Sequence, residues 1–328
     1  MTDARRMARE YAAQGMSKAE IGRQLGVPRE TVRDWLARDF DVDKPTDVSG
    51  LTVEELVEDR KRRFARKRLY EEARRCIPVR INIPGPVGIL HFGDPHVDDD
   101  GTDIAALERH TGLVANTEGL FAANVGDTTN NWIGRLARLY GEQSTSAAEA
   151  WALAEWFVRR CDWLYMIGGN HDAWSGAGDP LKWIAGQTVY ESSEVRLALT
   201  FPNKRVCTIN ARHDFAGHSQ WNPTHGAMKA AQMGVRDDIL VCGHKHVSGY
   251  QPLKIPNEDR ISHCIQVASY KVFDRYAKER GFRDQHISPS VLTIIDPNAK
   301  TAAGFVNVFH EIEEGVEYLT WKRQRKAA

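Results

Sequence analysis

Five short apolar runs in the middle of the chain each end directly in aspartate, histidine or asparagine side chains. The runs are typical of buried strands, and the first of them spans Val87 to Phe92. Side chains that follow the carboxyl ends of strands in an open α/β sheet converge on one crevice. The pattern therefore predicts one site built from five loops, which carry Asp94 and His96, Asp127, Asn170 to Asp172, His213 and Asp214, and His244 and His246.

The donor atoms of these loops are carboxylate, amide and imidazole groups, without a thiolate. Such a set of oxygen and nitrogen ligands suits manganese, iron or zinc. The candidates are too many for one tetrahedral zinc ion and fit two divalent ions about 3.5 to 4 Å apart. One carboxylate must then bridge the two ions, and Asp127 is the natural choice because its loop is central in the series. The seven predicted ligands are Asp94, His96, Asp127, Asn170, His213, His244 and His246.

Two ions at this spacing predict the hydrolysis of a phosphate ester. They clamp the oxygens of the ester and lower the pKa of a shared water toward about 7, which provides a metal-bridging hydroxide for in-line attack. The leaving alkoxide then needs a proton. We expect His171 to supply it as the general acid, because His171 stands beside the ligand Asn170 and is not needed to complete either shell. Asp172 is expected to orient the His171 imidazole.

Read in order, the motifs are Asp-x-His, Gly-Asp, Gly-Asn-His-Asp, His and Gly-His-x-His, within about residues 85–250. This series resembles that of the calcineurin-like metallophosphoesterases. The resemblance implies an α/β fold of two facing mixed β-sheets flanked by helices, which is a four-layer sandwich with the site at the strand ends. It also implies two ligand sets, in which one ion is held by Asp94, His96, Asp127 and His246, and the other by Asp127, Asn170, His213 and His244.

The chain departs from the family pattern after the Gly-Asp motif. Many members have a second acidic residue there, whereas this chain continues Thr128-Thr129-Asn130-Asn131. The departure leaves the ligands intact and leaves open which groups contact them from outside. In the fourth motif we prefer His213 as the ligand because it falls where the strand ends. His218 is the alternative ligand, or a residue that binds substrate.

Arg135 and Arg138 follow the bridging aspartate and lie three residues apart on an expected helix. One face of that helix could therefore meet a phosphate of the substrate. The alternative is a helix face that is simply solvated.

Three short helices are expected within residues 1–40. Ser17 to Glu20 form a capping box that starts the second helix, and Gly26 supplies the left-handed residue of a tight turn. The pattern resembles the helix-turn-helix of DNA-binding domains such as the resolvase and small-terminase types. The resemblance implies that Arg29, Thr31 and Arg33 contact DNA from the third helix. The nearly balanced charge of this segment keeps docking on another protein as an alternative.

Residues 41–80 are interpreted as a polar linker followed by a basic helix. Thr52 to Glu55 form a second capping box, and basic residues dominate from Arg60 onward. The basic run could follow a phosphate backbone. Equally, a helix that is acidic at its start and basic at its end is favoured by the helix dipole alone. We therefore predict a helix-turn-helix domain at 1–40, a linker and basic helix at 41–80, and a metallophosphoesterase domain at 81–328.

Overall charge does not identify a partner, because Lys plus Arg and Asp plus Glu both number 44. No apolar run approaches the roughly 18 residues that span a bilayer, and the first residues lack a signal-peptide core. We expect a cytoplasmic protein that does not bind a membrane, located in a bacterial host if a phage encodes it. The sequence does not indicate an oligomeric state.

The leading hypothesis is a phosphodiesterase or nuclease that acts on DNA with two divalent ions, of which Mn²⁺ is expected first and iron or Zn²⁺ next. It rests on the coupling of the five motifs to a helix-turn-helix and a basic helix, a combination similar to phage or prophage metallophosphoesterases. Two alternatives remain open. One is a phosphatase or phosphodiesterase for a small molecule or a phosphoprotein, and the other is a DNA-binding regulator with a non-catalytic metallo-domain.

Overall fold

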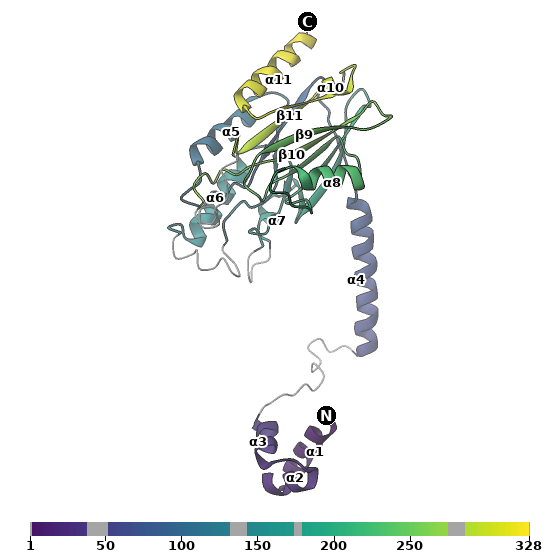
Figure 1. Cartoon of the computed structure of the whole chain (residues 1–328), viewed down its shortest axis with the longest axis vertical. Coiled ribbons are helices and arrows are strands. Elements are labelled where there is room, and N and C mark those ends of the chain that lie inside the picture. Colours follow the sequence, from purple (N-terminus) through teal and green to yellow (C-terminus); the bar gives the residue numbers. More distant parts are fainter. Residues whose placement is uncertain (1, 38–51, 132–142, 174–178, 275–285, 328) are drawn as a thin grey trace. The chain divides into compact units, whose positions relative to one another are not determined.

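The computed structural model describes residues 2–37, 52–131, 143–173, 179–274 and 286–327. The chain forms two compact units, residues 1–70 and residues 71–328 (Figure 1). The division into three domains at residues 40 and 80 stays a prediction. None of the helices in the described ranges combines the length and the apolar character that a membrane crossing requires.

The first unit contains the three expected short helices, α1 (Thr2–Ala13), α2 (Lys18–Leu25) and α3 (Arg29–Ala37). They pack around a small core in which Ala8, Ile21 and Val32 are buried. The capping box is formed, because the Ser17 hydroxyl accepts from the Glu20 amide and the Glu20 carboxylate accepts from the Ser17 amide. Gly26 ends α2 with a φ of 67°, in the left-handed region that glycine adopts without strain.

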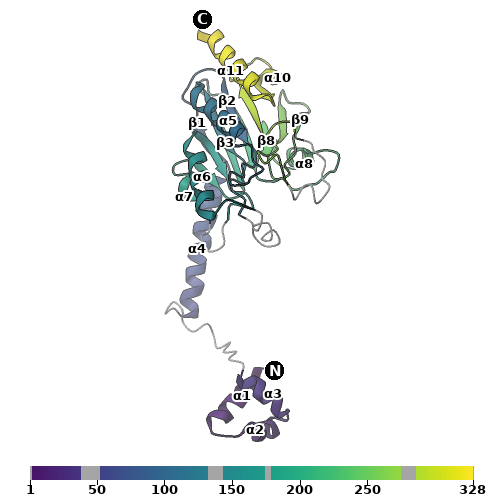
Figure 2. The ribbon, with the colours of Figure 1, turned by 90° about the vertical axis from the view of Figure 1, so that its left-hand side faces the viewer.

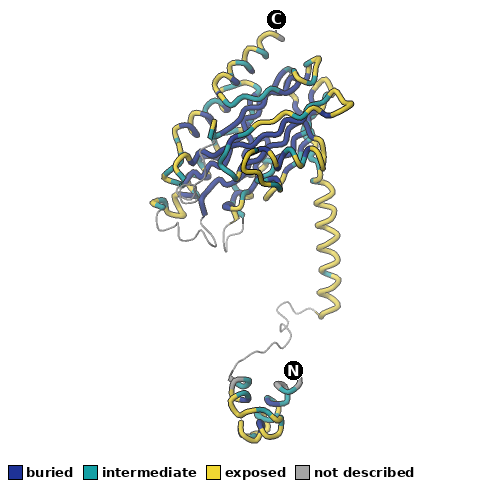
Figure 3. Tube along the Cα trace, in the orientation of Figure 1, coloured by how far each residue is buried: buried dark blue, intermediate teal, exposed yellow. Residues whose placement is uncertain are grey.

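The long helix α4 (Val53–Arg74) begins at the second capping box, between Thr52 and Glu55. None of its residues is buried, and Figure 3 shows most of the helix as exposed. Glu58 and Asp59 form ion pairs with Lys61, Arg62 and Arg63, one turn further along. Exposed pairs of this kind contribute only about 0.3–0.5 kcal/mol each, so they leave the basic side chains available to a partner.

Two six-stranded mixed sheets form the centre of the second unit. The first has the order β12-β11-β2-β3-β4-β5, and the second has the order β1-β6-β7-β8-β10-β9. In the first sheet, β2, β3 and β4 run parallel to one another, as do β7 and β8 in the second. The strands of the first sheet are β2 (Val87–Phe92), β3 (Leu120–Asn124), β4 (Trp163–Ile167), β5 (Val189–Glu191), β11 (Ser290–Ile295) and β12 (Val306–Phe309). Those of the second are β1 (Ile77–Arg80), β6 (Glu194–Thr200), β7 (Val206–Arg212), β8 (Ile239–Cys242), β9 (Gly249–Lys254) and β10 (Ile261–Gln266).

The two sheets pack face to face through one hydrophobic core. Ile89 of the first sheet is buried in the same cluster as Ile209 and Val241 of the second. The next residue along β2, Leu90, belongs to a different cluster, because successive side chains of a strand point to opposite faces. Complete burial of each such side chain stabilises the fold by about 1.5–3 kcal/mol relative to leaving it exposed.

Helices cover the outer face of each sheet (Figure 2). Leu107, Phe157 and Leu319 pack with Leu90 on the first sheet, and Ala227 packs with residues of β8 and β10 on the second. The helices on the first sheet are α5 (Ile104–Asn116), α6 (Ala147–Arg159), α7 (Leu181–Ile184) and α11 (Ile312–Ala327), the helix on the second is α8 (His225–Met233), and the short α10 (Ala302–Phe305) leads into β12. The expected four-layer sandwich, with a small helical region at its amino-terminal side in sequence, is confirmed.

The five apolar runs are strands, as the sequence predicts, but they belong to two sheets. Three of them are β2, β3 and β4, and the other two are β7 and β8. The carboxyl ends of both parallel groups point to the same end of the sandwich, so loops from different sheets meet there.

Candidate metal centre

Two groups of aspartate and histidine side chains lie at the strand ends. Within each group, one ligand atom from every residue lies within 4.8 Å of the others. Loops that follow β2 and β8 supply the first group, while loops that follow β3, β7 and β8 supply the second. The first group is Asp94, His96 and His246, and the second is Asp127, His213 and His244.

The seventh predicted ligand, Asn170, lies next to the second group. Its Oδ1 is 2.9 Å from the Nε2 of His213. The chain thus brings all seven predicted residues together at one place. Within the described ranges, His213 rather than His218 joins the second group, while His218 is exposed on the loop between β7 and α8.

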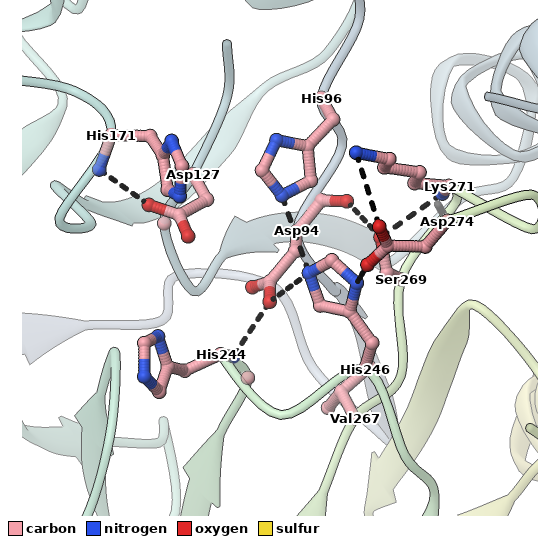
Figure 4. Close-up of polar contacts among 12 residues, drawn as sticks. Asp94, His96, Asp127, His171, His244, His246, Val267, Ser269, Lys271 and Asp274 are labelled. Atoms are coloured by element: carbon pink, nitrogen blue, oxygen red, sulfur yellow. Dashed lines mark hydrogen bonds and ion pairs between the residues drawn. The ribbon is translucent and has the colours of Figure 1, made fainter. Parts of the chain in front are cut away.

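The two groups adjoin through Asp94 and His213, because the Oδ1 of Asp94 lies 3.9 Å from the Nδ1 of His213. Asp94 lies between them in Figure 4, and its Oδ2 is 3.3 Å from the Nε2 of His246 and accepts a 2.6 Å hydrogen bond from the backbone amide of His244. The Nε2 of His213 is 3.1 Å from the Oδ2 of Asp127 and 3.1 Å from the Nδ1 of His244. The groups therefore form one continuous polar centre.

The donor set fits divalent ions. The Oδ1 of Asp94 is buried without a hydrogen-bond partner in the part of the chain that the structure describes, and such an oxygen is costly to bury unless a cation or donor meets it. The Nε2 atoms of His96 and His246 lie 3.3 Å apart, so both rings turn a nitrogen toward the same point. Carboxylate and imidazole donors that converge in this way, without thiolates, are the ligands of manganese, iron and zinc.

Four of the six group residues hold a left-handed backbone, with φ of 39° at His96, 52° at Asp127, 69° at His244 and 51° at His246. Each such conformation costs a non-glycine residue about 1–3 kcal/mol and persists only where the surrounding fold enforces it. The fold therefore holds these side chains toward the centre at a cost in folding free energy.

The glycines of the motifs are required by close approach. A Cβ atom at Gly169 would lie 2.0 Å from the Oδ1 of Asp127, and one at Gly243 would lie 2.3 Å from the Oδ1 of Asp94. Any other residue at these two positions would occupy the place of a carboxylate. The glycines that precede Asn170 and His244 in sequence are thus part of the centre.

The imidazoles and carboxylates of the centre change each other's pKa values. Burial lowers the pKa of His213, but the Asp127 carboxylate beside it outweighs burial and raises that pKa to about 10. Burial likewise lowers the pKa of His246, which Asp274 and Asp94 raise to about 9. An ion that binds to either ring takes the place of a proton, so ion binding is linked to proton release.

The predicted general acid His171 is buried beside Asp127. Its backbone amide donates a 2.9 Å hydrogen bond to the Oδ1 of Asp127, and its ring stands edge-on to the ring of His96, with centroids 5.3 Å apart. The Nδ1 of His171 faces the backbone carbonyl of Asn130. His171 therefore lies at the centre without belonging to either group.

Asp172 has a different set of partners from the one expected. Its two carboxylate oxygens accept hydrogen bonds from the backbone amides of Thr128, at 2.9 Å, and Gly169, at 2.7 Å. The bond from Thr128 joins the loop after β4 to the loop after β3, and the bond from Gly169 closes the loop after β4 on itself. The group that faces the Nδ1 of the His171 ring is the carbonyl of Asn130, at the position where the sequence left the outer contacts open.

Sequence reasoning missed several buried polar residues around the centre. Asn130 donates to the carboxylates of Asp98 and Asp99, each at 2.7 Å, and Lys271 and Asp274 lie close by. The run of aspartates directly after the first motif was a usable signal. Lys271 and Asp274 gave none, because they follow β10, which ends without a motif.

The remaining predicted residues belong to the first unit or lie outside the described residues. Arg135 and Arg138 lie outside the described residues. Arg29 and Arg33 are exposed on α3, and Thr31 is partly buried there.

Comparison with known proteins gives one family match and several distant structural likenesses. Residues 6–41 match the model of the CENP-B N-terminal DNA-binding domain. No curated protein matches the chain. Among solved structures, the chain is similar to vacuolar protein sorting 29 from Cryptosporidium parvum, with 14% identity, a TM-score of 0.37 and coverage of 69% of this chain and 97% of that one.

Two further structures show a similar level of likeness. The NAD nucleotidase of Haemophilus influenzae has 11% identity and a TM-score of 0.34, over 68% of this chain and 49% of that one. The calcineurin-like phosphoesterase YfkN of Bacillus subtilis has 11% identity and a TM-score of 0.33, over 69% of this chain and 89% of that one. Likeness at this distance transfers no activity, and the case for function rests on the centre itself.

Proposed function

We propose that the chain is a metal-dependent phosphoesterase that cleaves DNA, and that its amino-terminal helices bind the nucleic acid. The observation that carries the proposal is the centre of two adjoining aspartate and histidine groups, with four members held in a strained backbone. A fold that merely packed histidines in its core would place them in relaxed conformations with ordinary partners, as it does for His91 between Tyr165 and Thr293.

Asp127 is proposed to serve both ions, because its Oδ2 lies 3.1 Å from the Nε2 of His213 in the second group and its backbone carbonyl accepts a 3.0 Å hydrogen bond from the amide of His96 in the first. We propose Mn²⁺ for both positions. Bound divalent ions polarise the oxygens of a phosphate ester and lower the pKa of a bound water. The first ion would be held by Asp94, His96, Asp127 and His246, and the second by Asp127, Asn170, His213 and His244.

His171 is proposed to donate the proton that the leaving alkoxide needs. Its Nδ1 faces the Asn130 carbonyl, so the ring presents Nε2 as the atom that passes the proton. The backbone bond to Asp127 fixes the position of this ring relative to the ligand groups. We propose no role as a ligand for His171, since neither of the two groups includes it.

DNA is the proposed substrate because the amino-terminal match is to a DNA-binding domain. Arg29 and Arg33 are exposed on α3, and the basic run of α4 from Arg60 to Arg68 is exposed along its length. Basic side chains on such surfaces bind phosphates by counterion release, which makes affinity fall as salt rises.

The test uses the full chain with labelled single-stranded DNA, labelled double-stranded DNA and a generic phosphodiester, bis(p-nitrophenyl) phosphate. Each substrate is incubated with Mn²⁺ or with chelator, and the wild type is compared with His171→Ala. DNA cleavage that needs both Mn²⁺ and His171 supports the proposal. Cleavage of the generic ester alone favours a small-molecule enzyme, and DNA binding without turnover of any substrate, with ions bound, favours a regulator.

A further inference from the structure

The amino group of Lys271 is buried between two carboxylates beside the candidate metal centre. Its Nζ lies 2.9 Å from the Oδ2 of Asp99 and 3.6 Å from the Oδ1 of Asp274, and its side chain is 6% exposed. A buried ammonium group is stable only when such partners replace water. Figure 4 shows Lys271 and Asp274 next to the ring of His246.

The second oxygen of Asp274 faces His246. Its Oδ2 is 3.5 Å from the Nδ1 of His246, while the Nε2 of the same ring is 3.3 Å from the Oδ2 of Asp94. The ring is thus held from behind by one carboxylate and directed at the first group. A carboxylate behind a histidine in this way fixes the ring's tautomer and orientation and makes it a better ligand.

The segment that carries Lys271 is fastened to the loop after β2. The hydroxyl of Ser269 donates a 2.7 Å hydrogen bond to the backbone carbonyl of Asp94 and accepts one of 3.0 Å from the amide of Lys271. The amide of Val272 donates to the carbonyl of Gly101 at 3.0 Å. The backbone on which Lys271 and Asp274 stand is therefore fixed relative to the first ligand.

Asp99, the other carboxylate partner of Lys271, connects Lys271 to the side of the centre where His171 lies. The Oδ2 of Asp99 also accepts a 2.7 Å hydrogen bond from the side chain of Asn130, whose backbone carbonyl faces His171. Lys271 consequently stands between the contacts of a ligand, His246, and those of the proposed general acid.

We propose that Asp274 is a positioning residue for His246 and that Lys271 holds Asp274 in place. This inference rests on the proposed function, since it requires that the two groups bind ions. Electrostatics alone gives Lys271 the opposite effect, because a cation near an ion site repels the ion. A positioning role and a purely electrostatic role thus predict changes of opposite sign.

The first test measures the binding of Mn²⁺ to the full chain by titration calorimetry. We expect the wild type to bind two ions and Asp274→Asn to bind one of them about 10- to 100-fold more weakly, with the other unchanged. The matched control is Asp100→Asn, which removes an equal charge next to Asp99 from a side chain that bonds to Ser144. An equal loss in both variants, or no loss in Asp274→Asn, overturns the positioning role.

The second test compares Lys271→Met with Lys271→Arg. If Lys271 holds Asp274, the methionine variant binds the first ion about 10-fold more weakly, and arginine, which keeps the cation, restores most of the affinity. Tighter binding by Lys271→Met overturns the role of Lys271, because it shows that repulsion is the main effect of the ammonium.

A measurement on the wild type makes the inference independent of how well the variants fold. The measurement is NMR spectroscopy of the Zn²⁺-loaded chain with ¹⁵N-labelled histidine. We expect His246 to bind the ion through Nε2 and to carry a slowly exchanging Nδ1 proton. Binding through Nδ1 overturns the inference. A wild type that binds no divalent ion contradicts the proposed function itself, whereas two ions bound with unchanged affinity in Asp274→Asn contradict only the inference.

Discussion

The Oδ2 of Asp127 and the Nε2 of His213 lie 3.1 Å apart, although the two residues follow strands of different sheets. Asp127 follows β3 of the first sheet, and His213 follows β7 of the second. The centre therefore exists only when the two sheets are packed together. The arrangement of its residues therefore depends on the packing of the whole second unit as well as on the loops that carry them.

Asp127→Asn should remove both ions, because we propose that this carboxylate serves both positions. An amide keeps the volume of the side chain and loses the charge that attracts a cation. The metal content of the dialysed protein, measured by mass spectrometry, checks the expectation. Asp214→Asn is the control, since Asp214 adjoins His213 and pairs with Lys245 instead of joining a group. Retention of one ion by Asp127→Asn would restrict Asp127 to a single position.

His171→Ala should keep both ions and lower kcat by on the order of 100-fold or more, because general acid catalysis supplies about that factor. Turnover and metal content are measured on the same preparation. His225→Ala, which alters an exposed histidine of α8 outside both groups, should retain the wild-type rate. Loss of metal from His171→Ala would show that His171 is a ligand.

Gly243→Ala should weaken ion binding by at least about 10-fold, because its methyl group would meet the Oδ1 of Asp94 at 2.3 Å. Forcing an atom into a packed site also costs about 1–3 kcal/mol of unfolding free energy. Calorimetric titration and urea unfolding measure the two effects. The control is Gly112→Ala on α5, where nothing lies within 4 Å of the added atom and a gain of up to about 1 kcal/mol is expected. Equal ion affinity in both variants would contradict the close-approach argument.

Replacing Arg29 and Arg33 by alanine should weaken DNA binding and flatten its dependence on salt. Each lost phosphate contact lowers the slope of log K against log salt by about 1. Fluorescence anisotropy at several salt concentrations gives both quantities. Lys300→Ala, which removes an exposed charge from the second unit, serves as the control. An unchanged slope would assign the first unit to protein docking.

The second unit should lose stability as pH falls below about 6.5, partly because of His91. Burial lowers the pKa of His91 from 6.5 to about 3. Between these values the unfolded chain binds one more proton than the folded chain, so acid favours unfolding by roughly 1.4 kcal/mol per pH unit for this one group. Urea unfolding of metal-free protein at pH 7 and pH 5 should therefore show a smaller loss in His91→Gln than in the wild type. Parallel losses in the two proteins would contradict the assignment.

Much of the centre follows from local sequence. A buried strand that ends in a ligand is a short-range pattern, so Val87 to Phe92 and the four later runs were recognisable one at a time. The glycines of the motifs could be located for the same reason, because each directly precedes a predicted ligand in sequence. The proposed general acid His171 also stands beside a predicted ligand in sequence, and it lies next to Asp127 in the structure.

Long-range pairing accounts for what the sequence could not supply. Nothing local in Lys271 or Asp274 indicates that β10 lies parallel to β8 and delivers them behind His246. The assignment of the five strands to two sheets depends likewise on which strands pair, since buried strands of either sheet have the same apolar pattern. The partner of the His171 ring was missed because it is a backbone carbonyl, which every residue type offers.

Because the residues of the centre come from both sheets, a bound ion would also hold the two sheets together. An ion that binds the folded unit and not the unfolded chain stabilises both sheets together, by about 2.7 kcal/mol when its concentration is 100 times its Kd. Metal supply would then set the lifetime of the protein against proteases as well as its rate of turnover. Starvation for the ion would then lower the amount of folded protein in addition to stopping the proposed reaction.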